Sequence, residues 1–576
     1  MQQGKKRQTC VVPSASFMDI KDQLLREAEA LSAFSWPMLV KPREWTNEAP
    51  GGYLLDEVML GHDMVRGDHQ CIQGETPLEF LNELQATAYQ VNPFVYSVAR
   101  ALSDKGYAVG KFLPIIDHPL PSKPVDIATN KDARQSYRRE CAQVRNRIAA
   151  EFRKSCRTRM TMDTAERFID KKEFYLPWSF DYRGRAYPIP AFLTPHDTDF
   201  GKSLIRFAYP TPLTESGEDW LAFQVATTYG KDKDTIKERL AWVKENFTFI
   251  SSVAQDPIGN LSLWEGVSEP WLFLAACDEY YHCCISRERS LTCLPVYVDA
   301  TCSGLQILAG LARDASTARL VNVLPSSCPQ DAYKAVAEVA RPKVPESIRE
   351  HLDRKVVKKV VMTIPYNAKG QSNRTYIREA LAEKGIDISF EDLWTTAKVV
   401  RDAMDEIVPG PMKVMTWIES VVSEVIKGGA EDISWTTPSG FVVIQRLMKK
   451  ETEVIQLQLL GSRKRVKVST GDSDKVDLLH HKNATAPNLI HSVDASLLHM
   501  AITGFQYPVS VIHDSVLCRA SDMDKLSDIV RQTYMWLFTN HDILKDWAED
   551  IGSDSEPPII GDLEPSSVIE STYFFC

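Results

Sequence analysis

The sequence predicts an α+β fold, and three stretches carry that prediction. Residues 291–340 follow the order strand, turn, helix; residues 441–468 alternate like a long two-armed β-ribbon; residues 508–518 have a tight hairpin pattern. An amphipathic helical pattern over 345–366 separates the first two. Strands and helices mix without regular βαβ alternation, which favours α+β over α/β.

The bulk composition excludes some classes of protein. The chain has 576 residues, a net charge of -10 and twelve cysteines, none of them in a Cys-x-x-Cys pair. That length fits about four domain-sized units or one large fold with subdomains. We expect reduced thiols, with no zinc or redox motif. No apolar run reaches 18 residues, so we expect no membrane partner. A negative total does not exclude nucleic acid, because a groove needs only local positive charge.

Residues 131–172 have a helical and strongly basic pattern, with thirteen Lys or Arg against six Asp or Glu. One interpretation is a solvated helix face. The other is a phosphate-contacting surface that follows a nucleic-acid backbone over several turns. The sequence alone leaves both open.

Two aspartates stand at the ends of predicted strands. Asp299 follows the apolar Val296 and Val298, and Asp514 lies between the two apolar arms of the 508–518 hairpin. Carboxylates at strand ends suit an oxygen-loving cation such as magnesium. The plainer alternatives are that Asp299 caps the helix after it and that Asp514 is an ordinary turn residue.

The predicted helix at 345–366 carries cations on one face. Arg354, Lys358 and Met362 are spaced four residues apart, opposite an apolar face. Two cations one turn apart suit a triphosphate, although a solvated basic face is the plainer alternative. Two separated carboxylates and a cationic helix are together the set that two-metal phosphoryl transfer needs.

These residues resemble the single-subunit, bacteriophage-type DNA-directed RNA polymerases, a family that also includes mitochondrial and chloroplast enzymes. Residues 180–187 (Phe-Asp-Tyr-Arg-Gly-Arg-Ala-Tyr) resemble the family's segment near template and nascent RNA. Residues 486–494 resemble its histidine segment, and the aromatic residues 573–576 its C-terminus. The resemblance extends from about Lys41 to the end of the chain.

The resemblance implies a metal site and a nucleotide site. Asp299 and Asp514 would hold two magnesium ions, helped by the backbone carbonyl of Ala300, and Lys358 would donate a proton to pyrophosphate. The remaining substrate-binding side chains are Arg354 and Lys233 on the triphosphate, Tyr366 and His491 at the ribose 2′-hydroxyl, Tyr333 beside the nucleotide, and Arg185 beside the RNA end.

The resemblance also implies contacts with nucleic acid. Tyr182, Arg183 and Tyr187 would contact template and RNA. The ribbon, at about 441–475, would read promoter bases in the major groove. Its predicted tip carries the basic side chains Arg463, Lys464, Arg465 and Lys467.

A right-hand polymerase fold is the implied architecture, with thumb, palm and fingers and a small antiparallel sheet in the palm. The expected divisions are an N-terminal remnant at 1–84, a basic thumb at 85–171, palm at 172–315 and 492–576, and fingers at 316–491. About 36 residues stand where the family has a sizeable N-terminal domain, so we expect most of that domain to be lacking.

The implied partners are a double-stranded DNA template with its promoter, nascent RNA and rNTPs. We expect a monomer that transcribes a phage genome in the cytoplasm of the infected bacterial host, since no transit peptide is evident. An accessory initiation factor is one way to replace the missing N-terminal domain.

Three departures and two rival functions qualify the resemblance. Asn367 replaces the usual Gly, Pro365 a small residue, and Gln371 an aromatic that helps to separate template strands. One rival is a DNA polymerase of the same fold, which would usually carry Glu where Ser515 stands. The other is a catalytically inactive, polymerase-like DNA-binding protein.

Overall fold

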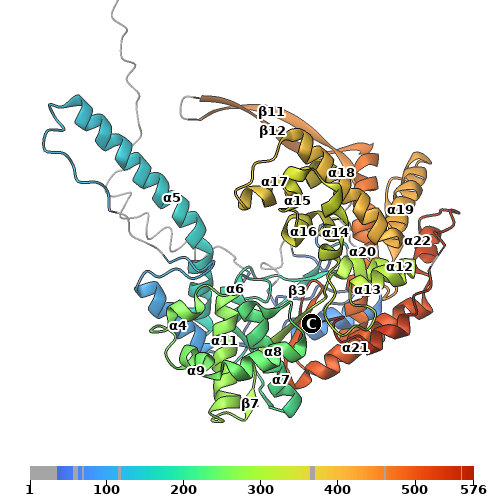
Figure 1. Cartoon of the computed structure of the whole chain (residues 1–576), viewed down its shortest axis with the longest axis horizontal. Coiled ribbons are helices and arrows are strands. Elements are labelled where there is room, and N and C mark those ends of the chain that lie inside the picture. Colours follow the sequence, from blue (N-terminus) through green and yellow to red (C-terminus); the bar gives the residue numbers. More distant parts are fainter. Residues whose placement is uncertain are drawn as a thin grey trace, which may run out of the picture.

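The computed structural model describes residues 35–55, 62–67, 71–114, 119–363, 370–459, 462–559 and 561–575. Helices dominate, and the strands form small antiparallel sheets, which confirms the α+β prediction (Figure 1). The elements before the first aspartate are α3 (Glu75–Ala86), β1 (Ala88–Val91), α4 (Pro93–Asp104), α5 (Lys131–Phe168), β2 (Phe174–Tyr175), β3 (Trp178–Phe180), β4 (Ala186–Pro188), α6 (Asp199–Ser203), β5 (Ile205–Phe207), β6 (Thr211–Pro212), α7 (Glu215–Ala226), α8 (Ile236–Glu245), α9 (Phe247–Gln255), α10 (Leu261–Trp264), α11 (Pro270–Tyr280) and β7 (Leu291–Thr292).

The elements from the first aspartate onward are β8 (Pro295–Asp299), α12 (Ser303–Ala312), α13 (Ala315–Leu320), α14 (Ala332–Ala340), α15 (Glu346–Arg349), α16 (Arg354–Met362), α17 (Gly370–Glu383), α18 (Phe390–Ile407), α19 (Pro409–Lys427), β9 (Ile433–Thr436), β10 (Val442–Gln445), β11 (Met448–Leu459), β12 (Ser462–Val476), α20 (Leu478–Ile502), β13 (Val509–Ile512), β14 (Ser515–Arg519), α21 (Met523–Asn540) and α22 (Ile543–Asp550). A long run of helices, α12 to α19, separates β8 from the later strands.

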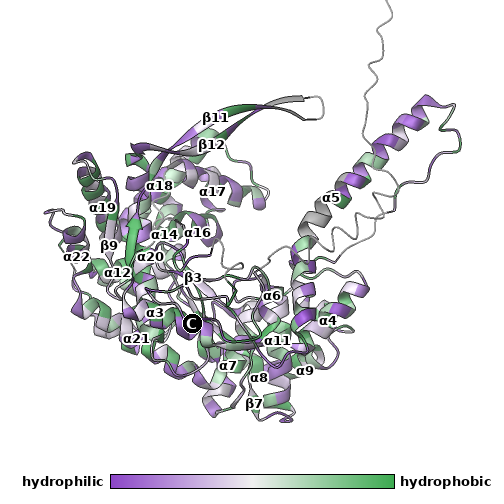
Figure 2. Ribbon diagram, turned by 180° about the vertical axis from the view of Figure 1, so that it is seen from behind, coloured by the Kyte–Doolittle hydropathy of each residue, from purple (hydrophilic) through white to green (hydrophobic). Residues whose placement is uncertain are grey.

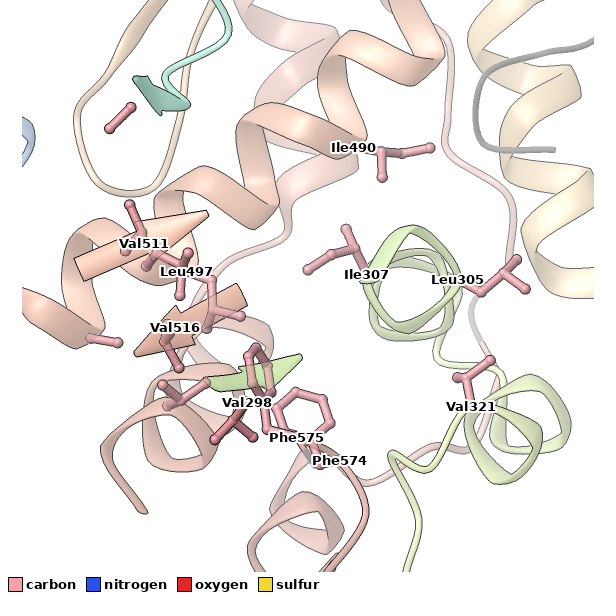
Figure 3. Packing of buried hydrophobic residues seen from close by; sticks show 14 of the residues in the cluster. Val298, Leu305, Ile307, Val321, Ile490, Leu497, Val511, Val516, Phe574 and Phe575 are labelled. Atoms are coloured by element: carbon pink, nitrogen blue, oxygen red, sulfur yellow. The ribbon is translucent and has the colours of Figure 1, made fainter. Parts of the chain in front are cut away.

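The aspartate sheet, as we define it, consists of β8, β13 and β14. Its order is β13-β14-β8, with both pairs antiparallel. Val298, Val511 and Val516 pack into the core between α20 and the C-terminal Phe574 and Phe575 (Figure 3). The hairpin expected at 508–518 is thus confirmed, and burial of its apolar side chains fixes its register.

Helix α20 is the central support of the site. Most of its 25 residues are buried, including polar ones such as His491, Ser492 and Asp494. A helix buried on nearly all sides can carry polar groups only where each finds a partner. It therefore holds functional side chains in a rigid, dry environment.

Helix α5 and the ribbon β11–β12 project from opposite parts of the molecule (Figure 1). Helix α5 confirms a helix in the basic stretch predicted at 131–172, although it ends at Phe168. It is coloured mainly hydrophilic in Figure 2. The ribbon pairs Leu459 with Ser462 next to its tip and Met448 with Val476 at its base. The described side chains of the ribbon are mostly exposed, whereas the C-terminal part of α5 buries a stripe that includes Thr161, Ala165 and Phe168.

Two sequence predictions need correction. The helix expected over 345–366 is broken: α15 ends at Arg349, and α16 starts anew after Asp353, whose carboxylate caps it by accepting from the Val356 N–H at 3.2 Å. A side-chain cap offers the backbone a fresh helix start, and this outweighs the continuous apolar period. Residues 364–366 lie outside the described residues.

The ribbon expected from 441 is two separate hairpins. Strand β10 pairs with β9, and the long ribbon starts only at Met448. Between them the Leu447 N–H donates to His481 Nε2 at 3.1 Å instead of to a neighbouring strand. That side-chain acceptor ends one ladder and lets the next begin.

Candidate active site

Asp299 and Asp514 meet at one edge of the aspartate sheet. Asp299 is the last residue of β8, and its register partner is Ser515, the first residue of β14. Asp514 precedes Ser515 in the two-residue turn between β13 and β14, where His513 adopts a left-handed φ of 59°. Asp299 does not cap the next helix, because Cys302 holds the N-cap position of α12.

The surroundings of the Asp299 carboxylate disfavour its charged form. It accepts a hydrogen bond from the Ser515 hydroxyl. The residue remains exposed to solvent, yet the protein that surrounds it raises its pKa through desolvation. The Ser515 bond opposes that rise and the negative charge of Asp514 adds to it. Two neighbouring carboxylates of this kind favour a bound cation.

The C-terminal tail supports the loop after Asp299. Ala300 forms a β-bridge with Phe575, and the Thr301 hydroxyl donates to the Tyr573 carbonyl at 2.8 Å. Gln306 Nε2 donates to the Phe574 carbonyl at 2.9 Å. The tail thereby fixes the backbone beside the metal-site candidates.

The cation helix, our name for α16, buries its valines and presents its cations. Val356 and Val360 are buried, whereas Lys358 and Met362 are exposed, which confirms the predicted faces. Desolvation, followed by the charges of Arg354 and Lys233, lowers the pKa of Lys358. A lysine with a lowered pKa gives up its proton more readily at neutral pH.

Lys233 connects the two halves of the site. Its positive charge opposes the desolvation that raises the pKa of Asp299, and it adds to the desolvation that lowers the pKa of Lys358. Its ammonium pairs with Asp232 at 2.6 Å, and both side chains are exposed. The carboxylates and the cations therefore belong to one electrostatic environment.

The turn between β3 and β4 supplies two arginines. Gly184 has a φ of 94°, which lets the chain reverse, and Asp181 accepts hydrogen bonds from the backbone and side chain of Arg183. Arg185 is buried and donates to Asp494 of α20 at 3.1 and 2.5 Å. This buried pair anchors the turn to the central helix.

Buried Asp494 is close to the metal-site candidates. It lines a cavity of about 10 Å³, the size of about one water molecule, together with Asp514, Ala300 and Phe575. Burial raises its pKa to about 6, the Arg185 charge opposes the rise, and Asp514 adds to it.

His491 is held neutral. Burial, with the charges of Arg185 and Arg183, lowers its pKa to about 2. Its Nδ1 lies 2.7 Å from an Arg183 Nη, which can only donate. The neutral ring therefore accepts at Nδ1 and carries its hydrogen on Nε2, which makes Nε2 a hydrogen-bond donor.

An aromatic cluster lies beside the 513–514 turn. The Tyr187 ring is 5.0 Å from His513 and 5.5 Å from His196, and the Arg66 guanidinium is 4.8 Å from it. The Tyr182 ring is 5.9 Å from the Arg183 guanidinium. Aromatic faces beside cations are a common platform for nucleic-acid bases.

The two projecting elements carry the remaining nucleic-acid candidates. In the ribbon, Arg465 and Lys467 are exposed and pair with Gln456 and Val454. Their alternate position places both on one face of the strand. The side chains of Arg463 and Lys464 lie outside the described ones, so their contacts stay a prediction.

Comparison with known proteins decides the family. A family model for DNA-dependent RNA polymerase matches residues 211–559, more than half of the chain and both candidate aspartates. The chain belongs to this family. The match confirms the resemblance to phage-type, single-subunit RNA polymerases.

Relatives come from phages, chloroplasts and mitochondria. The chain is 28% identical to the chloroplastic DNA-directed RNA polymerase 3B of Nicotiana tabacum, over 94% of this chain and 58% of the relative. It is 27% identical to the DNA-directed RNA polymerase of Enterobacteria phage K11, over 97% and 70%. The mitochondrial RNA polymerase 1 of Arabidopsis thaliana is 27% identical, over 94% and 58%. The chain thus spans little more than half the length of its plant relatives.

Sequence reasoning missed three residues in this polymerase-family site. Ser515 bonds Asp299, Asp494 pairs with Arg185, and Lys202 adds positive charge near Asp299. Ser515 had a usable signal because it follows Asp514 directly, and so had Asp494, which ends the 486–494 segment; Lys202 had none. Tyr366, with its neighbours Pro365 and Asn367, lies outside the described residues.

Proposed function

We propose that the chain is a DNA-directed RNA polymerase that joins rNTPs to an RNA 3′-hydroxyl and releases pyrophosphate. Membership of the DNA-dependent RNA polymerase family supports the reaction type. The observation that carries the proposal is the aspartate sheet, which brings Asp299 and Asp514 together within the electrostatic reach of Lys233.

Two magnesium ions fit this donor set. Among the described residues no three His, Cys, Asp or Glu side chains gather into a metal site. Magnesium commonly binds through one or two carboxylates, with water and substrate phosphates as its other ligands. Asp299 and Asp514 would supply the carboxylates and the Ala300 carbonyl a further oxygen. Bound there, the metal would lower the pKa of the attacking hydroxyl and offset charge on the leaving group.

The cation helix and its neighbours would handle the triphosphate. Arg354 and Lys233 would hold the phosphate oxygens. Lys358 would donate a proton to the leaving pyrophosphate, a role that its lowered pKa supports. These contacts gain strength as charge develops during transfer, so they favour the transition state over the bound substrate.

The sugar and the RNA end would be placed by the α20 side of the site. Neutral His491, which carries its hydrogen on Nε2, is suited to meet a 2′-hydroxyl, with Tyr366 as its proposed partner. Tyr333 would lie beside the nucleotide. Arg185 would act at the RNA end through the position of the 181–185 turn, since its guanidinium is buried against Asp494.

A right-hand arrangement would divide the work. The divisions follow the sequence: thumb at 85–171 with α5, palm at 172–315 and 492–576 with the aspartate sheet, fingers at 316–491, and a lead-in at 1–84. The basic α5 and the ribbon would grip DNA and RNA, with Tyr182, Arg183 and Tyr187 nearer the active centre. The described residues contain no helix fit to span a membrane. A monomer that transcribes a phage genome in a bacterial host completes the proposal, although organellar relatives are equally similar.

The test is primer extension with the purified chain. An RNA primer annealed to a DNA template, magnesium and labelled rNTPs should give templated products, and dNTPs should give far fewer. Preference for dNTPs would instead identify a DNA polymerase. Binding of the duplex with no extension would identify an inactive, polymerase-like protein.

A further inference from the structure

The guanidinium of Arg354 is held on two sides by the start of α14. Its Nε donates to a carboxylate oxygen of Asp331, the residue that precedes the helix. The ring of Tyr333, two residues later, lies 5.3 Å from the guanidinium centre. An ion pair along one edge and an aromatic face together set both the position and the plane of an arginine.

Asp331 is itself fixed from behind. Fully buried Asn322 has a left-handed φ of 59°, and its side chain accepts from the Gln330 N–H at 2.8 Å and donates to the Gln330 carbonyl at 3.1 Å. The Asn322 carbonyl accepts from the Ser571 hydroxyl at 2.6 Å. The residue before Asp331 is thus tied to the same C-terminal tail that supports Ala300.

The two oxygens of Asp331 do different jobs. Oδ1 accepts from the Tyr333 and Lys334 N–H groups at 2.9 and 3.1 Å and so caps α14. Oδ2 takes Arg354. Serine caps a helix about as well as aspartate but is too short and uncharged to hold a guanidinium. One substitution can therefore separate the two jobs.

The outer edge of Arg354 is available to a ligand. Within the described part of the chain, neither Nη makes a hydrogen bond or an ion pair, and the side chain is 30% exposed. Two parallel N–H groups on a planar cation are the arrangement that phosphate oxygens take up best. The Asp331 ion pair is itself 22–30% exposed, a setting in which an ion pair adds little to folding stability.

We propose that Asp331 is a positioning residue that presents the outer edge of Arg354 to the triphosphate of the incoming nucleotide. The inference rests on the proposed function, because it takes the nucleoside triphosphate as the ligand of this site. Asp331 does not touch that ligand. It holds the guanidinium in one orientation before the nucleotide binds. Less side-chain conformational entropy is then lost on binding.

The first arm of the test measures nucleotide addition to an RNA primer on a DNA template. Asp331→Ser should raise the apparent KM for the next rNTP about tenfold and change kcat by less than about threefold. Asp331→Asn keeps the cap and an oxygen near Nε, so it should fall between wild type and Asp331→Ser. In an Arg354→Ala background, Asp331→Ser should cause no further rise, because the group that it positions is gone.

A control variant makes the same substitution at another aspartate that caps a helix. Asp314 caps α13 through the Ser316 and Thr317 N–H groups at 2.9 and 3.2 Å. Asp314→Ser should leave the rNTP KM within about twofold of wild type. Asp314 also accepts from the Gly410 N–H at 3.0 Å, so Asp314→Ser should lower the thermal midpoint at least as much as Asp331→Ser.

The second arm measures equilibrium binding of a non-hydrolysable rNTP with magnesium by the full chain. It keeps the inference separate from the proposed function. A wild-type chain that binds the analogue but extends no primer would refute the polymerase proposal. The binding affinities of Asp331→Ser, Arg354→Ala and the double variant, a double-mutant cycle, would still test the positioning role. If the fold-losses of affinity in the two single variants multiply in the double variant, the two residues act independently and the positioning role is overturned. An unchanged or lowered KM in Asp331→Ser would overturn it as well.

Discussion

Charged side chains near the aspartate sheet have partners within the protein, whereas Lys358 on the cation helix makes no ion pair among the described residues. Near the sheet, Asp494 is paired with Arg185, Asp181 with Arg183, and Asp299 with the Ser515 hydroxyl. On the cation helix, Lys358 is exposed and makes no hydrogen bond or ion pair among the described residues. These side chains near the sheet have partners within the protein, whereas Lys358 is left for a ligand.

Under the proposed function, this difference indicates which charges the nucleotide and its metals would bring. A triphosphate can meet Lys358 and the outer edge of Arg354, and cations that travel with it can meet the neighbouring carboxylates Asp299 and Asp514. The paired side costs little reorganisation at the moment of reaction, since its dipoles and charges are already held. The open side gains most of its interactions only when substrate is bound.

Removing a sheet carboxylate should have the largest effect. Asp299→Asn should lower the rate of nucleotide addition by about three orders of magnitude or more, because it removes half of the carboxylate charge that would hold the metals. Affinity for primer–template should stay within about threefold in a binding assay at fixed salt. A variant that keeps more than about a tenth of the wild-type rate would remove Asp299 from the site.

The buried Arg185–Asp494 pair should matter for folding more than any exposed pair. Asp494→Asn leaves a buried guanidinium without its counter-charge, so the free energy of unfolding should fall by about 3–5 kcal/mol in a denaturant titration. Asp472→Asn, in the exposed pair with Lys450 on the ribbon, should change it by less than about 1 kcal/mol. Equal losses would contradict the contrast between balanced interior and open surface.

The ribbon tests whether exposed cations act only through DNA. Changing Arg465 and Lys467 to Ala should reduce promoter-driven RNA synthesis about tenfold and primer extension by less than about twofold, because promoter contacts are not needed on a preformed duplex. Binding to promoter DNA should also depend less steeply on salt. Val466→Thr, on the opposite face of β12, is the matched control and should change neither. Equal loss in both assays would make the ribbon a general clamp.

The smallest effect concerns the proton of Lys358. Its pKa is lowered, so under the proposed function the wild-type rate should begin to decline at a pH below the ordinary lysine pKa, as the ammonium loses the proton that it would donate. Lys358→Arg keeps its charge at all accessible pH, so this alkaline decline should move to higher pH even though the maximal rate drops several-fold. If the decline of the rate at high pH is unchanged by the substitution, that decline reports another group.

Local pattern was enough to predict some of the site. The apolar alternation around Asp514 predicted its hairpin, and four-residue spacing predicted the faces of the cation helix, because both follow from nearest neighbours along the chain. Family resemblance then selected Asp299 and Asp514 over plain cap and turn roles. The structure removes the cap alternative for Asp299, since Cys302 occupies that position.

What local pattern missed depends on partners distant in sequence. The Arg185–Asp494 pair joins residues more than 300 positions apart, and nothing near either residue announces the other. The break before α16 and the split of the ribbon were missed for a related reason. The side chains of Asp353 and His481 accept hydrogen bonds from backbone N–H groups that would otherwise continue a helix or a sheet. The spacing of apolar residues carries no information about such bonds.

The central claim is that Asp299 and Asp514 together hold the catalytic metals. Ferrous iron binds oxygen sites built for magnesium and, with ascorbate and peroxide, generates hydroxyl radicals that cut the nearby backbone. The account predicts cuts around 297–301 and 512–516, suppressed by excess magnesium and lost from both segments in Asp514→Asn. Cuts confined to one segment, or unchanged in that variant, would contradict it.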